Sequence, residues 1–184
     1  MHAIILAAGM GKRLKELTSN NTKCMIRVNG ITLIERVLGQ LDKLGLNRII
    51  IVVGYEGRKL MDYVNGLGIE TPVQYIENTI YHKTNNIYSL FLAREYMKLD
   101  DTLLLESDLI VEDGVLEDLL QDERDTLALV DKFESWMDGT VMELDDEDHI
   151  LKFIEGRKVR FHEKDAYYKT VNIYKFSRHF STHY

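Results

Sequence analysis

The chain has 184 residues, of which 45% are hydrophobic and 29% are charged. These fractions are typical of a folded globular domain, so they exclude a disordered or fibrous chain. The single cysteine, Cys24, excludes an internal disulfide and suits a reducing compartment. The apolar runs are too short to cross a bilayer, and the amino-terminal residues lack the pattern of a signal peptide. We therefore expect a cytoplasmic protein with no membrane partner.

The formal net charge of −7 is unevenly distributed. Residues 1–61 contain 10 Lys and Arg against 4 Asp and Glu, whereas residues 62–184 contain 13 against 26. A chain that is acidic overall is poorly suited to binding nucleic acid, so we expect no such partner. The basic first third favours a small anion at one end of the molecule, and the acidic remainder favours a cation.

Apolar runs with strand character alternate with helical patterns through most of the chain. Buried strands are predicted over residues 3–8, 48–53, 73–77, 102–106 and 126–130. Helices are predicted over residues 33–44, 60–64, 87–97 and 115–120, with Gly45 as the cap that ends the first. This β-α-β alternation predicts an α/β fold, a doubly wound and mostly parallel sheet with helices on both faces.

The alternation of predicted strands and helices stops near the carboxyl-terminal end of the chain. Residues 140–144 and 149–154 flank an acidic turn and predict a β-hairpin insertion. Residues 168–176 alternate like one further strand, and the chain ends a few residues later. We therefore expect one domain over residues 1–184, truncated at its carboxyl-terminal end.

The most informative segment follows the first predicted strand and reads Leu6-Ala7-Ala8-Gly9-Met10-Gly11-Lys12-Arg13. Glycines at a strand end let backbone N–H groups approach a phosphate chain, and Arg13 and Lys23 add positive charge around the same anion. A P-loop is excluded because Leu6 and Arg13 stand where it needs Gly and Ser or Thr. The dinucleotide fingerprint is excluded because Leu14 stands where it needs a small residue.

This segment, with Lys23, resembles the signature of the sugar-phosphate nucleotidyltransferase superfamily. Within it, the chain is most similar to cytidylyltransferases that act on phosphocholine or 2-aminoethylphosphonate. The supporting stretches are Ile51-Val52-Val53-Gly54-Tyr55, Thr84-Asn85-Asn86-Ile87-Tyr88-Ser89-Leu90, Glu106-Ser107-Asp108 and Glu134-Ser135-Trp136. The resemblance implies the Rossmann-like nucleotidyltransferase fold. One departure is Thr22, which stands where the family usually has proline.

The resemblance implies two catalytic cations: Lys23 neutralises the α-phosphate during displacement, and Arg13 holds the leaving pyrophosphate. Nucleotide contacts are expected from Leu6, Ala8, Gly9, Met10, Gly11, Lys12, Tyr55, Asn85, Asn86 and Ser89. Gly54 and Tyr55 are expected at the floor of the nucleotide pocket. For Asn85, Asn86 and Ser89 the alternative is a capping role, with Asn86 as the cap of the following helix.

Asp108 follows a buried strand, where open α/β sheets bind ligands. The resemblance implies that it binds Mg²⁺, and the alternative is that it caps the next helix. Glu106, two residues earlier, is an alternative or assisting ligand. The family's second metal carboxylate falls beyond residue 184.

The acceptor site is predicted around Trp136, the single tryptophan, whose ring can face an ammonium group. Asp131, Glu134 and Asp138 place negative charge nearby. One ring among carboxylates favours a primary ammonium, hence 2-aminoethylphosphonate, although Tyr167 and Tyr168 are available to build an aromatic cage for phosphocholine.

The expected function is Mg²⁺-dependent transfer of CMP from CTP to a small zwitterionic phosphonate or phosphate, with release of pyrophosphate. Alternatives are a phosphocholine cytidylyltransferase, a sugar-1-phosphate nucleotidyltransferase, and an inactive nucleotide-sensing domain of the same fold. Some relatives also imply a fused carboxyl-terminal aminotransferase domain.

Overall fold

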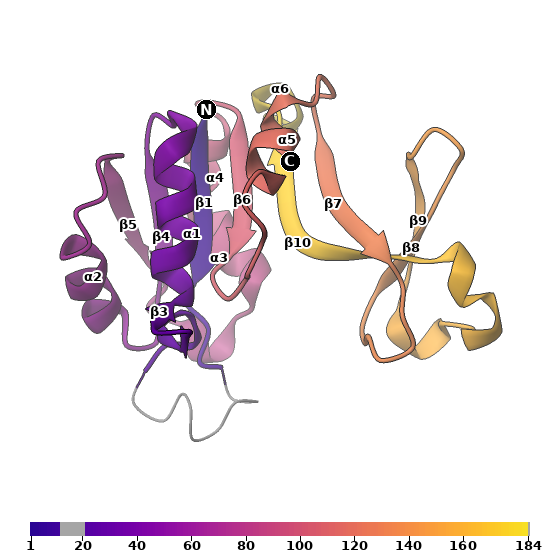
Figure 1. The fold of residues 1–184 in the computed structure, drawn as a ribbon, viewed down its shortest axis with the longest axis horizontal. Helices are drawn as coiled ribbons and strands as arrows, with labels where there is room; N and C mark the ends of the chain where they lie inside the picture. Colours follow the sequence, from indigo (N-terminus) through magenta and orange to yellow (C-terminus); the bar gives the residue numbers. More distant parts are fainter. Residues whose placement is uncertain (12–20, 184) are drawn as a thin grey trace. The chain divides into compact units, whose positions relative to one another are not determined.

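The computed structural model describes residues 1–11 and 21–183. The chain divides into two compact units, of which the first contains residues 1–127 and 174–184 and the second contains residues 128–173. The elements of both are labelled in Figure 1. The predicted hairpin belongs to the second unit, and the segments predicted to bind the nucleotide belong to the first.

The parallel strands of the first unit are β1 (His2–Ala7), β4 (Ile49–Val53), β5 (Val73–Glu77) and β6 (Thr102–Glu106). They are hydrogen-bonded in the order β5-β4-β1-β6, and β10 (Tyr168–Phe176) follows β6 in the sheet. All residues of β1 and β4 are buried, as expected for strands that helices cover on both faces. The α/β prediction is confirmed.

Helices cover both faces of these strands. The helices are α1 (Leu33–Leu41), α2 (Gly57–Asn65), α3 (Asn86–Leu92), α4 (Arg94–Met97), α5 (Val115–Gln121) and α6 (Arg178–Ser181). Leu90, Ala93 and Met97 pack on one side of the sheet with apolar side chains from β1, β4 and β6. In Figure 1, α3 and α4 lie behind these strands and α1 lies in front of them. The helix predicted over residues 87–97 is two helices, because the backbone leaves helical geometry at Ala93 (φ −91°, ψ 1°).

Cap residues fix where the other elements end. Gly45 has a φ of 65°, which favours glycine, and it ends the 3₁₀ turn Asp42–Leu44 that extends α1, as predicted. The short strands β2 (Arg27–Val28) and β3 (Ile31–Thr32) pair with each other just before α1. None of the helices in the described ranges is long and apolar enough to cross a membrane.

The second unit is built on antiparallel pairs. Its strands are most of β7 (Leu127–Lys132), all of β8 (Val141–Leu144) and β9 (Ile150–Ile154), and the first part of β10. β8 and β9 form the predicted hairpin, with Val141 opposite Ile154. Phe133, Val141 and Tyr167 form a small apolar core.

Candidate active site

Strand register brings three predicted segments to one edge of the sheet. Ala7 lies opposite Val53 of β4, and Leu6 lies opposite Glu106 of β6. The backbone N–H of Tyr55 donates to the carbonyl of Ala8 over 3.2 Å. The chain therefore leaves β1, β4 and β6 at the same carboxyl edge, where α/β sheets bind ligands.

The turn after β1 contains two glycines that the sequence predicts to lie against phosphate. Gly11 has a φ of 59°, which favours glycine, and a Cβ added to Gly9 would meet nothing within 4 Å. The side chains of Leu6 and Ala8 are buried, so only their backbone groups are available to a nucleotide. Met10 is half-buried in the same turn. The predicted cations Lys12 and Arg13 lie outside the described residues.

Gly54 permits a close approach between β4 and its neighbours. A Cβ at this position would stand 2.8 Å from the carbonyl oxygen of Ala8 and 2.9 Å from Cβ of Tyr81. The rings of Tyr55 and Tyr81 meet edge to face, with centroids 6.2 Å apart. The predicted pocket floor at Gly54 and Tyr55 therefore lies against the turn that carries Ala8.

The two polar residues predicted at the reaction centre are in contact. Lys23 lies in the 3₁₀ helix η2 (Lys23–Met25), and Asp108 follows β6. Lys23 Nζ forms an ion pair with Oδ2 of Asp108, and the two side chains are 40% and 20% exposed. Residues 85 positions apart in the sequence thus form one charged pair at the carboxyl edge.

A second contact, made by Cys24, lies beside this ion pair, and no sequence motif indicates it. Cys24 is 1% exposed, its Sγ lies 2.9 Å from Oγ1 of Thr22, and it also hydrogen-bonds with the Ser107 side chain. Burial raises the pKa of the Cys24 thiol to about 11 although both hydrogen bonds oppose this, so the thiol stays protonated. Lys23 therefore pairs with Asp108, and Cys24 pairs with Ser107. These two contacts fix η2 against the end of β6.

Thr22 occupies the position that is usually proline in the family. Its φ of −73° lies within the range that a proline ring imposes, and its side chain is buried against Cys24. The hydrogen bond to the thiol thus restrains the loop where the proline ring is missing.

Glu106 is a second acidic residue at this edge, next to Asp108. Its Oε1 accepts a hydrogen bond of 2.5 Å from Nδ2 of Asn86. Burial raises the pKa of the Glu106 carboxyl, and the neighbouring charge of Asp108 raises it further, whereas Asn86 and Lys23 oppose the shift. Two partly buried carboxylates are a donor set of the kind that Mg²⁺ prefers. Asp108 and Glu106 would therefore be the residues that hold the ion.

Two predicted capping roles are wrong. The cap of α3 is Asn85, whose side chain accepts from the backbone N–H of Tyr88, so Asn86 is free of that role and donates to Glu106. The cap position of α5 is Gly114, six residues beyond Asp108. Asp108 therefore does not cap α5, and its carboxylate lies at the edge of the sheet in the ion pair with Lys23.

Asn78, which the sequence analysis did not single out, organises the segment before α3. Its buried amide donates to Thr84 Oγ1 and to Ser89 Oγ over 3.1 Å each, and its own oxygen accepts from the backbone N–H of Ile80. Ser89 is 3% exposed, so its hydroxyl faces this interior network. Asn78 thereby sets where the exposed Asn85 and Asn86 lie.

The predicted acceptor residues belong to the second unit and lie at its surface. Trp136 is 79% exposed, Asp131 and Asp138 are exposed, and Glu134 has Lys164 Nζ at 3.8 Å. Tyr167 is a core residue whose hydroxyl donates to Glu163, so the expectation that it could complete an aromatic cage is wrong. The ring of Tyr168 faces Lys132 Nζ at 3.9 Å.

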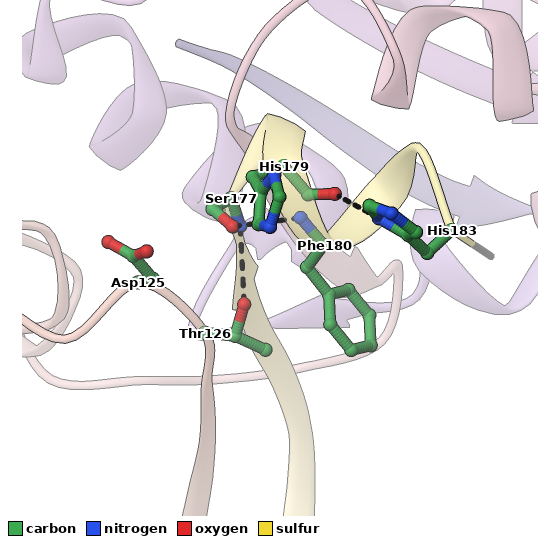
Figure 2. A pocket seen from close by; sticks show the side chains of 6 residues that line it. All are labelled: Asp125, Thr126, Ser177, His179, Phe180 and His183. Atoms are coloured by element: carbon green, nitrogen blue, oxygen red, sulfur yellow. Dashed lines mark hydrogen bonds between the residues drawn. The ribbon is translucent and has the colours of Figure 1, made fainter.

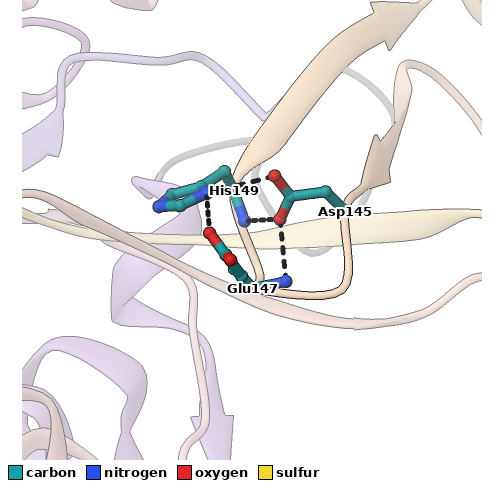
Figure 3. Close-up of side chains that lie close together, drawn as sticks. All are labelled: Asp145, Glu147 and His149. Atoms are coloured by element: carbon teal, nitrogen blue, oxygen red, sulfur yellow. Dashed lines mark hydrogen bonds and ion pairs between the residues drawn. The ribbon is translucent and has the colours of Figure 1, made fainter.

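Two other polar groupings occur in the described residues, and hydrogen bonds within a turn explain the first of them. In the hairpin turn, Asp145 accepts from the backbone N–H groups of Glu147 and His149 and pairs with the His149 ring, as Figure 3 shows. Figure 2 shows a hollow lined by Asp125, Thr126, Ser177, His179, Phe180 and His183. Asp101, at the amino end of β6, accepts from the backbone N–H of Arg178 in α6. The hollow, which includes residues of α6, therefore lies near the amino end of β6, whereas Asp108 follows its carboxyl end.

The fold and this edge define a nucleotidyltransferase domain. The chain belongs to the MobA-like NTP transferase domain family, which it matches over residues 3–158.

Three relatives illustrate the similarity. The chain is 29% identical to the CTP:phosphoglutamine cytidylyltransferase of Campylobacter jejuni, over 98% of this chain and 74% of that protein. It is 34% identical to the 2-aminoethylphosphonate cytidylyltransferase of Lancefieldella rimae, over 84% of this chain, and the aligned region spans 61% of that protein. The structure of CTP:phosphocholine cytidylyltransferase from Streptococcus pneumoniae matches 99% of this chain and 73% of its own, with a TM-score of 0.81 and 26% identity.

Proposed function

We propose that the protein transfers CMP from CTP to a small phosphonate or phosphate that carries an amine, and that 2-aminoethylphosphonate is preferred to phosphocholine. The observation that carries this proposal is the joint placement of Lys23, Asp108, Glu106 and Asn86 beside the glycine turn after β1. The similarity to cytidylyltransferases of phosphoglutamine, 2-aminoethylphosphonate and phosphocholine supports cytidine as the nucleoside and a phosphoryl compound as the acceptor.

The reaction is an in-line displacement. An oxygen of the acceptor forms a bond to the α-phosphorus of CTP, the bond from that phosphorus to the bridging oxygen breaks, and pyrophosphate leaves with the electron pair. A phosphonate or phosphate is already anionic at neutral pH, so no general base is needed. Catalysis is then a matter of positioning two anions and stabilising the charge that develops between them.

The residues of the carboxyl edge suit these tasks. The Lys23 ammonium, carried by η2, would stabilise charge on the α-phosphate. A Mg²⁺ ion held by Asp108 would supply the further positive charge that two anionic substrates require. The backbone of Gly9 to Gly11 offers N–H groups to the phosphate chain.

The preference among acceptors rests on the second unit. Of the three rings predicted at the acceptor site, Tyr167 is in the core and Tyr168 faces Lys132, so Trp136 is the one that is mostly exposed, with the exposed Asp131, Glu134 and Asp138 close to it in the sequence. A single face with nearby acceptors favours a primary ammonium, which donates three hydrogen bonds, over a methylated one, which donates none.

Pyrophosphate release tests the proposal directly. The protein is assayed with each of the four nucleoside triphosphates against 2-aminoethylphosphonate, phosphocholine and a sugar 1-phosphate, with Mg²⁺ and with EDTA. We expect turnover with CTP and 2-aminoethylphosphonate that EDTA abolishes. Turnover with the sugar 1-phosphate alone would contradict the proposal, and CTP binding without turnover would favour a nucleotide-sensing domain.

A further inference from the structure

The contact between Lys23 and Asp108 joins two groups with different proposed tasks. The ammonium is needed at the nucleotide phosphate, and the carboxylate is needed at the metal ion. In the structure, Lys23 Nζ and Oδ2 of Asp108 are paired with each other. A divalent cation would bind the same carboxylate. It would then lie close to the Lys23 ammonium and repel it.

The backbone on either side of Lys23 is held in place. Thr22 and Cys24 are each 1% exposed, and the Cys24 thiol hydrogen-bonds with both Thr22 and Ser107. The N–H of Met25 donates to the carbonyl of Thr22 over 3.1 Å, which closes the turn. Since the main chain is fixed, the part of Lys23 that can change position is its flexible four-carbon side chain, which is 40% exposed.

The acidic pair explains why an ammonium is present there at all. Glu106 is the last residue of β6 and Asp108 lies two residues later, and the charge of Asp108 disfavours the charged form of Glu106. Lys23 is the positively charged side chain that acts on both of them in the described part of the chain. A cation beside these carboxylates offsets that repulsion, and among the described residues Lys23 supplies one.

We propose that Lys23 is the resident counter-ion of Asp108, that it releases this carboxylate when a divalent cation binds, and that its ammonium is thereby made available to the phosphates of the nucleotide. The inference rests on the metal site of the proposed function. It predicts opposite effects of one substitution: loss of Lys23 weakens catalysis but tightens metal binding in the absence of nucleotide.

Binding of Mn²⁺ without nucleotide tests the exchange, with titration followed by electron paramagnetic resonance. We expect Lys23→Gln to lower the dissociation constant by about tenfold, because the ion no longer competes with an ammonium. The matched control is Arg27→Gln, which removes the same charge from the exposed strand β2, where its side chain donates to the carbonyl of Gly30. Arg27→Gln is expected to leave the constant within about twofold.

Several outcomes would overturn the inference. Equal tightening in both variants would mean that only net charge matters, and no tightening in Lys23→Gln would mean that Lys23 does not compete. Absence of Mn²⁺ binding to every variant would remove the metal site of the proposed function and the exchange with it. Mn²⁺ binding that Lys23→Gln does not tighten would contradict the exchange but leave the metal site of the proposed function in place.

A second readout follows Lys23 itself. In protein labelled with ¹³C at lysine Cε, the resonance missing from Lys23→Gln is expected to move when Mg²⁺ is added to the unsubstituted protein. In Asp108→Asn this resonance is expected to stay still. A resonance that moves equally in both proteins would contradict the exchange.

Discussion

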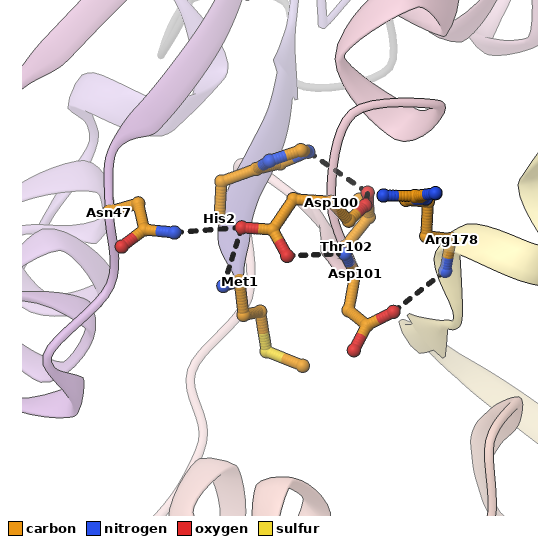
Figure 4. A network of polar contacts seen from close by, with 7 residues as sticks. All are labelled: Met1, His2, Asn47, Asp100, Asp101, Thr102 and Arg178. Atoms are coloured by element: carbon orange, nitrogen blue, oxygen red, sulfur yellow. Dashed lines mark hydrogen bonds and ion pairs between the residues drawn. The ribbon is translucent and has the colours of Figure 1, made fainter.

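The two edges of the parallel sheet in the first unit are both rich in polar residues, yet they differ in how their charges are satisfied. At the amino edge, Asp100 accepts from the amino terminus of Met1 and from Asn47 Nδ2, each over 2.7 Å, as Figure 4 shows. Although burial opposes it, these hydrogen bonds lower the pKa of the Asp100 carboxyl. At the carboxyl edge, burial and the Asp108 charge raise the pKa of Glu106.

This difference indicates different roles for the two edges. Groups whose charged forms are stabilised by fixed partners contribute to the stability of the fold, whereas neighbouring like charges are typical of sites that bind ligands. Substitutions at the amino edge should therefore change stability and spare activity, and those at the carboxyl edge should do the reverse. The predictions below test that contrast, from the largest expected effect to the smallest.

Asp108→Asn is expected to lower turnover by about a thousandfold, because an amide lacks the charge that holds a divalent cation. Its ion pair with Lys23 is partly exposed, so the free energy of unfolding should change by no more than about 1 kcal/mol. Steady-state kinetics over a range of Mg²⁺ concentrations and urea unfolding measure both quantities. A variant that unfolds readily while retaining turnover would reverse the assignment of this edge.

His2 should make the amino edge sensitive to acid. It is 2% exposed, with Nε2 3.0 Å from Oγ1 of Thr102, and burial lowers its pKa from 6.5 to about 4, although the Asp100 charge opposes this. In the unfolded chain, His2 is therefore protonated below about pH 6.5. In the folded chain, it stays neutral down to about pH 4. Stability is lost as the pH falls through this window, by about 3 kcal/mol at most.

Urea unfolding of the unsubstituted protein and of His2→Gln between pH 7 and pH 4 measures this loss. Gln keeps a hydrogen-bonding group for Thr102 but does not titrate, so the variant should lose less stability across the window. Identical pH dependences would show that His2 does not contribute.

Lys23→Ala is expected to lower kcat by about a hundredfold, since it removes a cation that stabilises charge in the transition state. The side chain is 40% exposed, so the melting temperature should hardly change. Thermal unfolding and single-turnover kinetics at saturating CTP separate the two effects. Near-normal turnover would exclude Lys23 from the reaction.

Cys24→Ala is expected to lower kcat by about tenfold while leaving the affinity for CTP unchanged, because the thiol positions Lys23 through its contacts with Thr22 and Ser107. Cys24→Ser keeps a hydrogen-bonding group and should restore most of the rate. A double-mutant cycle distinguishes positioning from a general loss of stability: in the Lys23→Ala background, Cys24→Ala should cost no further activity. Additive losses would show that Cys24 acts independently of Lys23.

The first unit could largely be predicted from its sequence, because hydrophobic periodicity and glycine positions determine where its strands and turns lie. The apolar runs predicted as strands correspond to β1, β4, β5 and β6, and the structure brings Lys23 and Asp108 into contact, whereas the roles that the resemblance implies for them stay predictions. Periodicity does not reveal which polar side chain meets which. The hydrogen bond from Asn86 to Glu106 and the network of Asn78 depend on tertiary packing, so no local pattern indicated them.

The second unit was harder to predict, because exposed residues carry little periodic information. The hairpin of β8 and β9 followed from alternation around an acidic turn. Tyr167, however, was expected to be available to a ligand, and it is buried with Phe133 and Val141. An aromatic residue beside a strand has the same local pattern whether it faces a core or a ligand, so its exposure was decided by packing.

Trp136→Ala tests the acceptor preference and should have the smallest effect. Trp136 is 79% exposed, and an attraction between a cation and an exposed ring contributes about 0.5–1 kcal/mol. We therefore expect kcat/KM for 2-aminoethylphosphonate to fall by about two- to fivefold. Trp136→Phe keeps a ring face and should lose less. Phe153→Ala, which removes a 66% exposed ring from β9, is the matched control and should leave kcat/KM unchanged. The ratio of kcat/KM for 2-aminoethylphosphonate over phosphocholine decides the substrate: a ratio below one, or an unaltered rate in Trp136→Ala, would contradict the assignment of Trp136 to the ammonium group.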